Sequence, residues 1–269
     1  VPGMFIQIFH FLFCGIGMVF LLRFLGCTYW SSLLGSVGFM ITPYMVTMLV
    51  FGHGSQIMTA AYIPWIVMFA IKLWNDPKIL NIGILSLLLG FQLQRSHVQI
   101  AYYTWLLIGA FLFFKIINIA YKSKKLDSIV LRKLAFFALA CILGLAISFV
   151  IYLPSIEYSD FSIRGASSSG GAKYNYATSW SFHPKEILTF LLPSAFGFGG
   201  QAYWGYMPFT DYPNYMGIIV LLLALIATLQ KKNFIQWYLI ITSLLALSIS
   251  FGKHFSFVYD IFYSFFPFF

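Results

Sequence analysis

Long apolar runs follow one another along most of this chain, separated by short connections. Each run is close to the ~20 residues that a helix needs to cross the hydrocarbon core of a bilayer. Hydrophobic residues make up 61% of the 269 residues and charged residues only 9%. A soluble domain carries roughly a quarter of charged residues. Too few polar residues remain to face water on all sides, so the sequence predicts an integral membrane protein.

The apolar runs are continuous and do not alternate with polar residues, which favours helices over a β-barrel. We therefore predict an all-α fold, a polytopic transmembrane helical bundle of about 8–9 spans. Eight spans are expected at 4–22, 29–50, 56–74, 79–94, 98–118, 133–153, 214–230 and 234–251. An aromatic segment from Phe255 begins a ninth span or lies along the membrane. The predicted parts are spans one to six in 1–153, a polar loop in 154–213, and spans seven and eight in 214–269.

Basic residues in short loops mark the cytoplasmic side of membrane proteins. With alternating spans, 11 of the 16 basic residues fall on one side, with only Asp76 and Asp127 against them. The other side holds five basic and five acidic residues, so one topology accounts for the whole net charge of +9. This topology explains the charge better than a nucleic-acid partner, because the basic residues are scattered over several loops. It predicts a protein of the cytoplasmic (inner) membrane with loop 154–213 outside the cytoplasm.

The loop 154–213 is long and polar, with four of the seven acidic residues of the chain. Its Ser/Gly cluster at 166–172 is typical of a flexible tip. After it, Pro184 with Glu186 close behind indicates the start of a short helix, which is amphipathic enough to lie in the membrane interface. Because the loop stands out from an apolar chain, we expect substrate recognition or chemistry there.

Several polar groups are predicted to meet at this outer face. His53 closes the second span, Arg95 and His97 connect the fourth and fifth, His183 lies in the loop, and Lys253 and His254 follow the eighth. His10 is expected about two turns below this surface. Ionisable groups at a membrane are costly, which favours a functional interpretation. The alternative is that they are ordinary polar helix ends, satisfied by water.

Glu157 and Asp160 lie three residues apart after the sixth span. If that span continues by one turn, the two carboxylates share a face and are candidates for acid–base chemistry or a divalent metal. The alternative is a solvated loop start. Arg164 and Arg95 are candidate phosphate-binding residues, because the guanidinium fork matches phosphate oxygens. Trp180, Tyr203 and Trp204 are candidates for stacking on sugar rings, or else belong to an interfacial aromatic belt.

Particular residue strings resemble those of the YfhO-type bacterial membrane proteins. In the first half they are His10-Phe11-Leu12, Gly15-x-Gly17-Met18, Leu22-Arg23-x-Leu25-Gly26, Gly52-His53-Gly54 and the run His97 to Thr104. In the second half they are Leu153-Pro154-x-x-Glu157, Arg164-Gly165, Ala177-Thr178-Ser179-Trp180-Ser181, Leu192-Pro193, Tyr203-Trp204-Gly205, Tyr212-Pro213-x-Tyr215-x-Gly217 and Gly252-Lys253-His254. They arise in the family's order over essentially the whole chain.

The resemblance implies a membrane glycosyltransferase of the GT-C type. Such an enzyme takes a sugar from a polyprenyl-phosphate carrier at the outer membrane face and modifies a cell-envelope polymer. The resemblance departs in one respect, since GT-C enzymes usually hold a catalytic acidic residue in the first external loop, and no acidic residue precedes Asp76 here. Both ends of the chain also look cut. We therefore expect a fragment that lacks the first catalytic loop and has little activity by itself.

On this hypothesis the partners are the polyprenyl-phosphate-linked sugar, the polymer acceptor and membrane lipid, with no nucleic acid. Glu157, Asp160 and His97 are the candidate catalytic residues. The candidate substrate-binding residues are His53, Arg95, Arg164, Trp180, Tyr203, Trp204, Lys253 and His254. No metal ligand is assigned, and a divalent metal cofactor stays open. The rival hypotheses are a lipid or sugar flippase or transporter, and a non-catalytic envelope assembly protein.

The predicted topology is testable by cysteine accessibility on a cysteine-free background. A cysteine at Ser169, in the long loop, should react with a membrane-impermeant thiol reagent added outside the cell. A cysteine at Ser123, in the basic loop, should not react. The reverse pattern would place the polar loop in the cytoplasm and overturn both the topology and a lipid-linked donor.

Overall fold

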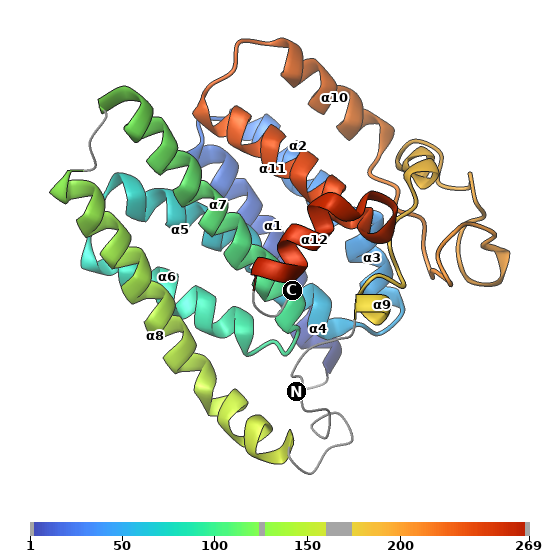
Figure 1. Cartoon of the computed structure of the whole chain (residues 1–269), viewed down its shortest axis with the longest axis horizontal. Coiled ribbons are helices and arrows are strands. Elements are labelled where there is room, and N and C mark those ends of the chain that lie inside the picture. The colour runs from blue at the N-terminus through green and yellow to red at the C-terminus, as the bar shows by residue number, and fades with distance from the viewer. Residues whose placement is uncertain (1–2, 124–126, 160–173, 267–269) are drawn as a thin grey trace. The chain divides into compact units, whose positions relative to one another are not determined.

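The computed structural model describes residues 3–123, 127–159 and 174–266, and every named element in them is a helix (Figure 1). Contacts between residues divide the chain into two compact units. Unit 1 comprises Val1–Ile41 and Met48–Ser162, and unit 2 comprises Thr42–Thr47 and Ile163–Phe269. The prediction of an all-α fold is confirmed for the described residues. The three-part division at 153 and 213 concerns membrane topology, which these contacts do not test.

The helices of the first half follow the expected apolar runs. They are α1 (Gly3–Phe24), α2 (Tyr29–Met40), α3 (Pro43–Val50), α4 (Gly54–Ala60), α5 (Ile63–Asn75), α6 (Ile79–Leu93), α7 (Val98–Ser123) and α8 (Ser128–Ser159). The second half contains α9 (Tyr174–Ala177), η1 (Pro184–Phe190), η2 (Gly200–Ala202), α10 (Ile218–Leu229), α11 (Phe234–Ser250), η3 (Gly252–Phe255) and α12 (Ser256–Phe265). The short helix predicted after Pro184 is present as the 3₁₀ helix η1.

Four segments of the described chain are long and apolar enough to cross a membrane. They are Gly3–Phe24, Gly54–Asn75, Val98–Tyr121 and Ser128–Tyr158. Two bent pairs raise the number to six if each pair is one span: α2 with α3, bent by 45°, and α11 with Gly252–Phe265, bent by 112°. The structure therefore supports a membrane protein with four to six candidate spans.

Two of the expected spans are apolar helices that are too short to cross a bilayer alone. α6 has 15 residues and α10 has 12. At about 1.5 Å per residue they reach about 22 and 18 Å, against about 30 Å of hydrocarbon. The number of eight or nine spans, and the side on which loop 154–213 lies, thus stay predictions.

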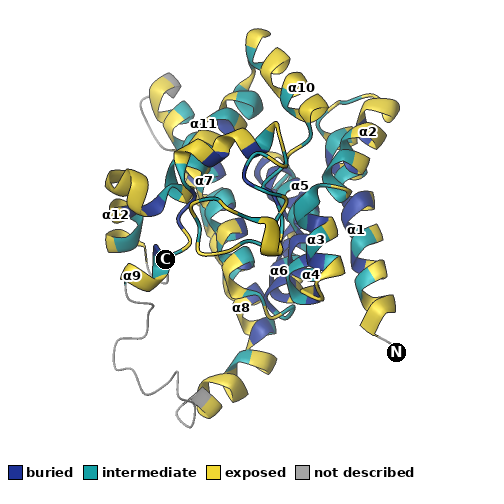
Figure 2. Ribbon diagram, turned by 90° about the vertical axis from the view of Figure 1, so that its right-hand side faces the viewer, coloured by how far each residue is buried: buried dark blue, intermediate teal, exposed yellow. Residues whose placement is uncertain are grey.

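Helix α5 lies at the centre of unit 1. It packs against α1, α6, α7 and α8, and its side chains are buried around most of its circumference (Figure 2). Ile66 and Leu73 are fully buried. A helix that is apolar on all sides is stable only when other helices surround it, which explains why this run forms the core of the unit.

Glycines of α6 and α8 let these two helices approach each other closely. A Cβ at Gly90 would lie 2.6 Å from Ile147 Cγ2 and 3.0 Å from the Gly144 carbonyl oxygen. A Cβ at Gly144 would lie 2.9 Å from Leu89 Cβ. Small residues let helices in membranes approach until their backbones touch, and dispersion then stabilises the pair.

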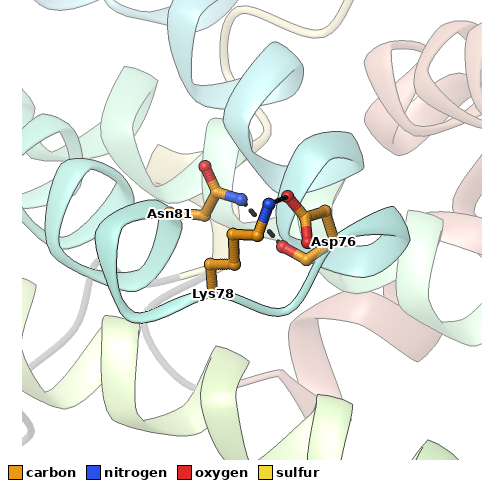
Figure 3. A network of polar contacts seen from close by, with 3 residues as sticks. All are labelled: Asp76, Lys78 and Asn81. Carbon is orange, nitrogen blue, oxygen red and sulfur yellow. Dashed lines mark hydrogen bonds and ion pairs between the residues drawn. The ribbon is translucent and has the colours of Figure 1, made fainter.

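The turn before α6 is closed by Asp76. Its carboxylate pairs with Lys78 Nζ at 2.8 Å, and its carbonyl oxygen accepts a hydrogen bond from Asn81 Nδ2 at 2.7 Å (Figure 3).

In unit 2, the sharp bend after α11 depends on Gly252. Its φ is +46°, and a Cβ there would lie 2.1 Å from Ser181 Oγ. Only glycine meets both conditions without strain. The bend ends α11 at Ser250 and sends α12 in a new direction, so the aromatic segment expected after Phe255 is a separate short helix.

The glycine contact predicts unequal effects of two alanine substitutions in α6. Gly90→Ala should destabilise the protein by about 1–3 kcal/mol, because Ile147 and the backbone of α8 must move. Gly83→Ala is the control, since a Cβ there meets nothing within 4 Å, and it should be neutral or stabilising by up to about 1 kcal/mol. The measurement is thermal unfolding of the purified protein in detergent. Equal melting temperatures for the two variants would contradict the packing.

Candidate functional site

Arg95 lies in the turn between α6 and α7, and this turn is anchored on α8. Gln94 Nε2 donates to the Ile147 carbonyl oxygen at 2.8 Å, and Tyr152 Oη donates to that of Leu93 at 3.0 Å. Ser96 turns the chain with a φ of +65°. Arg95 is half-buried, and its Nε is buried with no hydrogen-bond partner in the described residues. A buried donor of this kind is costly to leave unpaired.

His10 of α1 lies within electrostatic reach of Arg95. Its side chain is 4% exposed, and its Nδ1 lies 2.7 Å from the Ile6 carbonyl oxygen. Because a carbonyl oxygen only accepts, Nδ1 must carry a proton, and Nε2 of the neutral ring is an acceptor. That Nε2 is buried and has no partner in the described residues. Arg95 acts electrostatically on both His10 and Tyr62. The ring centroids of His10 and Tyr62 are 5.8 Å apart.

Unpartnered buried polar atoms are concentrated in one part of unit 1. In the described residues there are five such side-chain atoms: His10 Nε2, Gln92 Oε1, Arg95 Nε, Tyr102 Oη and Trp105 Nε1. Four of these residues lie within the 14 positions from Gln92 to Trp105, at the α6–α7 junction. Native proteins pair nearly all buried polar groups, and each exception requires an explanation such as a bound ligand or water. We define Arg95 and His10 as the unit 1 site.

His53 and His97 form a second pair in unit 1. His53 is exposed at the residue before α4, and His97 is half-buried before α7, where its Nδ1 accepts from the Ile100 N–H at 3.4 Å. Burial lowers the pKa of His97, a backbone hydrogen bond raises it, and the neighbouring His53 lowers it. His97 is therefore favoured in its neutral form near pH 7.

Glu186 organises the loop of unit 2. Its side chain is 1% exposed, and its Oε1 accepts hydrogen bonds from Tyr203 Oη at 2.7 Å and from the Tyr206 N–H at 2.6 Å. Tyr203 Oη in turn accepts from the Met207 N–H at 2.8 Å. Burial, together with the hydrogen bond to Glu186, raises the pKa of Tyr203 to about 12. The phenol thus stays protonated at neutral pH and remains the donor to the carboxylate.

The other predicted residues of unit 2 take different positions. His254 lies edge-on to His183, with ring centroids 4.7 Å apart, and the Lys253 N–H donates to Ser181 Oγ at 3.0 Å. Trp180 packs edge-on against Phe209 at 5.4 Å. Trp204 is largely exposed and contacts Phe196 at 4.9 Å. Tyr203 is engaged by Glu186, so it supports the loop instead of offering a free stacking surface.

Glu157 lies exposed in the last turn of α8, and no hydrogen bond or ion pair of its carboxylate is found in the described residues. Asp160 and Arg164 lie outside the described residues. In the described part of the chain, no three His, Cys, Asp or Glu side chains come together to hold a metal ion. The question of a divalent metal at Glu157 and Asp160 therefore stays open.

Sequence reasoning did not predict the contacts that make three residues prominent in the structure. His10 was expected only near the outer surface, although a histidine in an otherwise apolar span is itself a signal. Glu186 was interpreted as a helix-start residue, and Tyr206 was grouped with the loop aromatics that could stack on sugar rings or form an interfacial belt. Their roles depend on contacts with residues distant in sequence, which periodicity does not reveal.

Comparison with protein-family models, with curated proteins and with solved structures finds no match for this chain.

The anchoring role of Glu186 predicts a loss of stability on truncation. Glu186→Ala would leave the Tyr203 hydroxyl and the Tyr206 N–H without their acceptor, at a cost of about 2–4 kcal/mol. Glu157→Ala removes an exposed carboxylate and should change the free energy of unfolding by less than about 0.5 kcal/mol. Thermal unfolding in detergent compares the two variants. Equal stability of both would show that Glu186 does not anchor the loop.

Proposed function

We propose that the unit 1 site binds the phosphate of a lipid-linked sugar and that the protein transfers this sugar as a GT-C-type membrane glycosyltransferase. The proposal is carried by two nitrogens, Arg95 Nε and His10 Nε2, which are buried without a hydrogen-bond partner in the described residues, and by the effect of the Arg95 charge on His10. One is a cationic donor and the other is a neutral acceptor. Transfer from a phosphate-linked donor to a hydroxyl requires both kinds of group.

Arg95 serves the phosphate. Its guanidinium is always charged and presents donors in a planar fork that matches phosphate oxygens. During transfer, the bond between the sugar carbon and the phosphate oxygen breaks, and the electron pair of that bond stays on the phosphate. Arg95 stabilises the negative charge that develops there, as preorganised donors do in many enzymes.

His10 serves the acceptor. The hydrogen bond from Nδ1 to Ile6 fixes the tautomer of the neutral ring, so that Nε2 is ready to take a proton. In the proposed step the acceptor hydroxyl oxygen bonds to the sugar carbon, and the hydroxyl proton passes to His10 Nε2. Proton removal by a positioned histidine typically accelerates a reaction by about 10²–10⁴-fold.

The proposal places the site at the outer face of the cytoplasmic membrane, where the charge distribution of the loops puts the α6–α7 turn. The apolar helices of unit 1 support a substrate with a lipid tail, since they offer it a path through the bilayer. His97 and His53 belong to the same unit and are proposed to line the site. The acceptor is proposed to be a cell-envelope polymer, in keeping with the family resemblance.

Two substitutions in the full-length protein separate binding from chemistry. Arg95→Gln should weaken binding of polyprenyl phosphate by about 10–100-fold, because it removes charged hydrogen bonds to the phosphate. His10→Asn keeps a donor for the Ile6 carbonyl oxygen and removes Nε2. It should retain polyprenyl-phosphate binding and lower sugar transfer by about 10²–10⁴-fold. Binding is measured by ligand-induced thermal shift, and transfer by radiolabelled sugar incorporation.

Arg23→Gln is the control, because it also removes one arginine charge. Arg23 lies in the last turn of α1, whereas His10 lies in the first half of this helix, so the variant should leave binding and transfer unchanged. Wild-type binding by Arg95→Gln would refute the phosphate role. Wild-type transfer by His10→Asn would refute the role of His10 as base. Lipid binding without any sugar transfer by the wild-type protein would instead favour a flippase.

A further inference from the structure

A short segment of unit 2 is tied to the bend between α11 and η3. The Phe182 N–H donates to the Ser250 carbonyl oxygen at 2.8 Å, and the Lys253 N–H donates to Ser181 Oγ at 3.0 Å. The absent side chain of Gly252 makes room for Ser181. These contacts hold two basic segments together, one around His183 and the other around His254.

Four basic residues gather where the segments meet. The His183 ring stacks on Tyr206, with centroids 3.8 Å apart and planes at 15°, and His254 approaches His183 at 4.7 Å. Lys185 Nζ lies 5.7 Å from the centroid of the Tyr206 ring. The charge of Lys253 acts on His254. We call His183, Lys185, Lys253 and His254 the basic patch.

The two lysines of the basic patch are not paired with a carboxylate in the described residues. The carboxylate nearest in sequence, Glu186, is buried, and its Oε1 is engaged by Tyr203 and Tyr206. In the described part of the chain, neither Lys185 nor Lys253 forms an ion pair. Both lysines and His254 are exposed to solvent. An exposed group of unpaired cations on a fixed scaffold attracts anions.

We propose that the basic patch is a binding site for a phosphate group, distinct from the unit 1 site, and that binding is coupled to proton uptake by His254. Lysines bind phosphate as point charges, and two lysines with two imidazoles supply donors from several directions. A tetrahedral dianion uses such donors better than a planar carboxylate does. Tyr206, positioned through Glu186, supports both His183 and Lys185.

The geometry of the imidazoles explains the coupling to protons. Desolvation lowers the pKa of His254, and so do its neighbours His183, whose ring centroid lies 4.7 Å away, and Lys253. Among the described groups that act on His254, Glu186 alone acts in the opposite direction. A bound phosphate dianion offsets the effect of these positive neighbours, so binding favours protonation of His254.

The test is isothermal titration calorimetry of inorganic phosphate into the full-length protein. The Arg95→Gln background is used so that the unit 1 site does not contribute. The pH dependence is measured with sulfate, because sulfate keeps its dianionic charge between pH 6 and pH 8, whereas inorganic phosphate does not. Sulfate should bind more tightly at pH 6 than at pH 8, with a heat that depends on the ionisation enthalpy of the buffer. Lys253→Gln and Lys185→Gln should each lower the affinity by about three- to fivefold, as expected for exposed charge pairs. Raising the salt concentration should reduce the differences.

Lys231→Gln is the matched control. It removes one exposed positive charge before the start of α11, whereas Lys253 and His254 of the basic patch follow the end of this helix. An equal loss of affinity in Lys231→Gln would show a general effect of net charge and overturn the proposal. Absence of binding would overturn it as well, and so would a heat independent of the buffer. Any of these results would leave the proposal for Arg95 and His10 untouched.

A comparison of two lipid compositions distinguishes a lipid headgroup from a soluble phosphate group as the ligand of the basic patch. In nanodiscs of phosphatidylglycerol, a lipid phosphate that occupies the basic patch should weaken the binding of inorganic phosphate, relative to nanodiscs of phosphatidylcholine. Equal affinities in the two would identify a soluble phosphate group as the ligand. Both outcomes support the basic patch as a phosphate site.

Discussion

The interior of a bilayer offers no water to hydrogen-bond polar groups, and the structure of unit 1 follows from this constraint. Its hydroxyls donate within their own helix, as Thr59 does to the Ser55 carbonyl oxygen, or across to a neighbour, as Ser36 does to that of Gly15. Trp65 Nε1 likewise donates to the Phe13 carbonyl oxygen. Where polar groups are satisfied so consistently, the few that are not become informative. The unpartnered nitrogens of Arg95 and His10 are therefore the basis of the functional proposal.

Much of the helical architecture could be predicted, because hydropathy reports directly on the membrane. The runs at 4–22, 98–118 and 133–153 correspond to α1, α7 and α8. Hydropathy averaged over a window does not resolve local breaks, however. The bend at Gly252 depends on a positive φ and on contact with Ser181, and α10 is only 12 residues long although its apolar run was expected to span.

The candidate site was predictable only where the signal is local in the sequence. Arg95 and His97 were identified from their place at a helix junction, which is visible in the sequence. The partnership of Arg95 with His10 joins residues 85 positions apart, and the burial of Glu186 depends on Tyr203 and Tyr206. Glu157, the carboxylate predicted to be catalytic, is exposed to solvent, whereas Glu186 is buried and organises a loop. This contrast led us to propose His10, and not a described carboxylate, as the base.

The most direct test of the account is a cryo-electron microscopy structure of the full-length protein with bound polyprenyl phosphate. The account predicts that the phosphate lies within hydrogen-bond distance, about 3 Å, of Arg95 Nε. It also predicts that the lipid tail runs along the apolar helices of unit 1 and that His10 Nε2 faces the sugar-binding space. A phosphate bound away from Arg95, with Arg95 paired to a carboxylate of the protein, would contradict it.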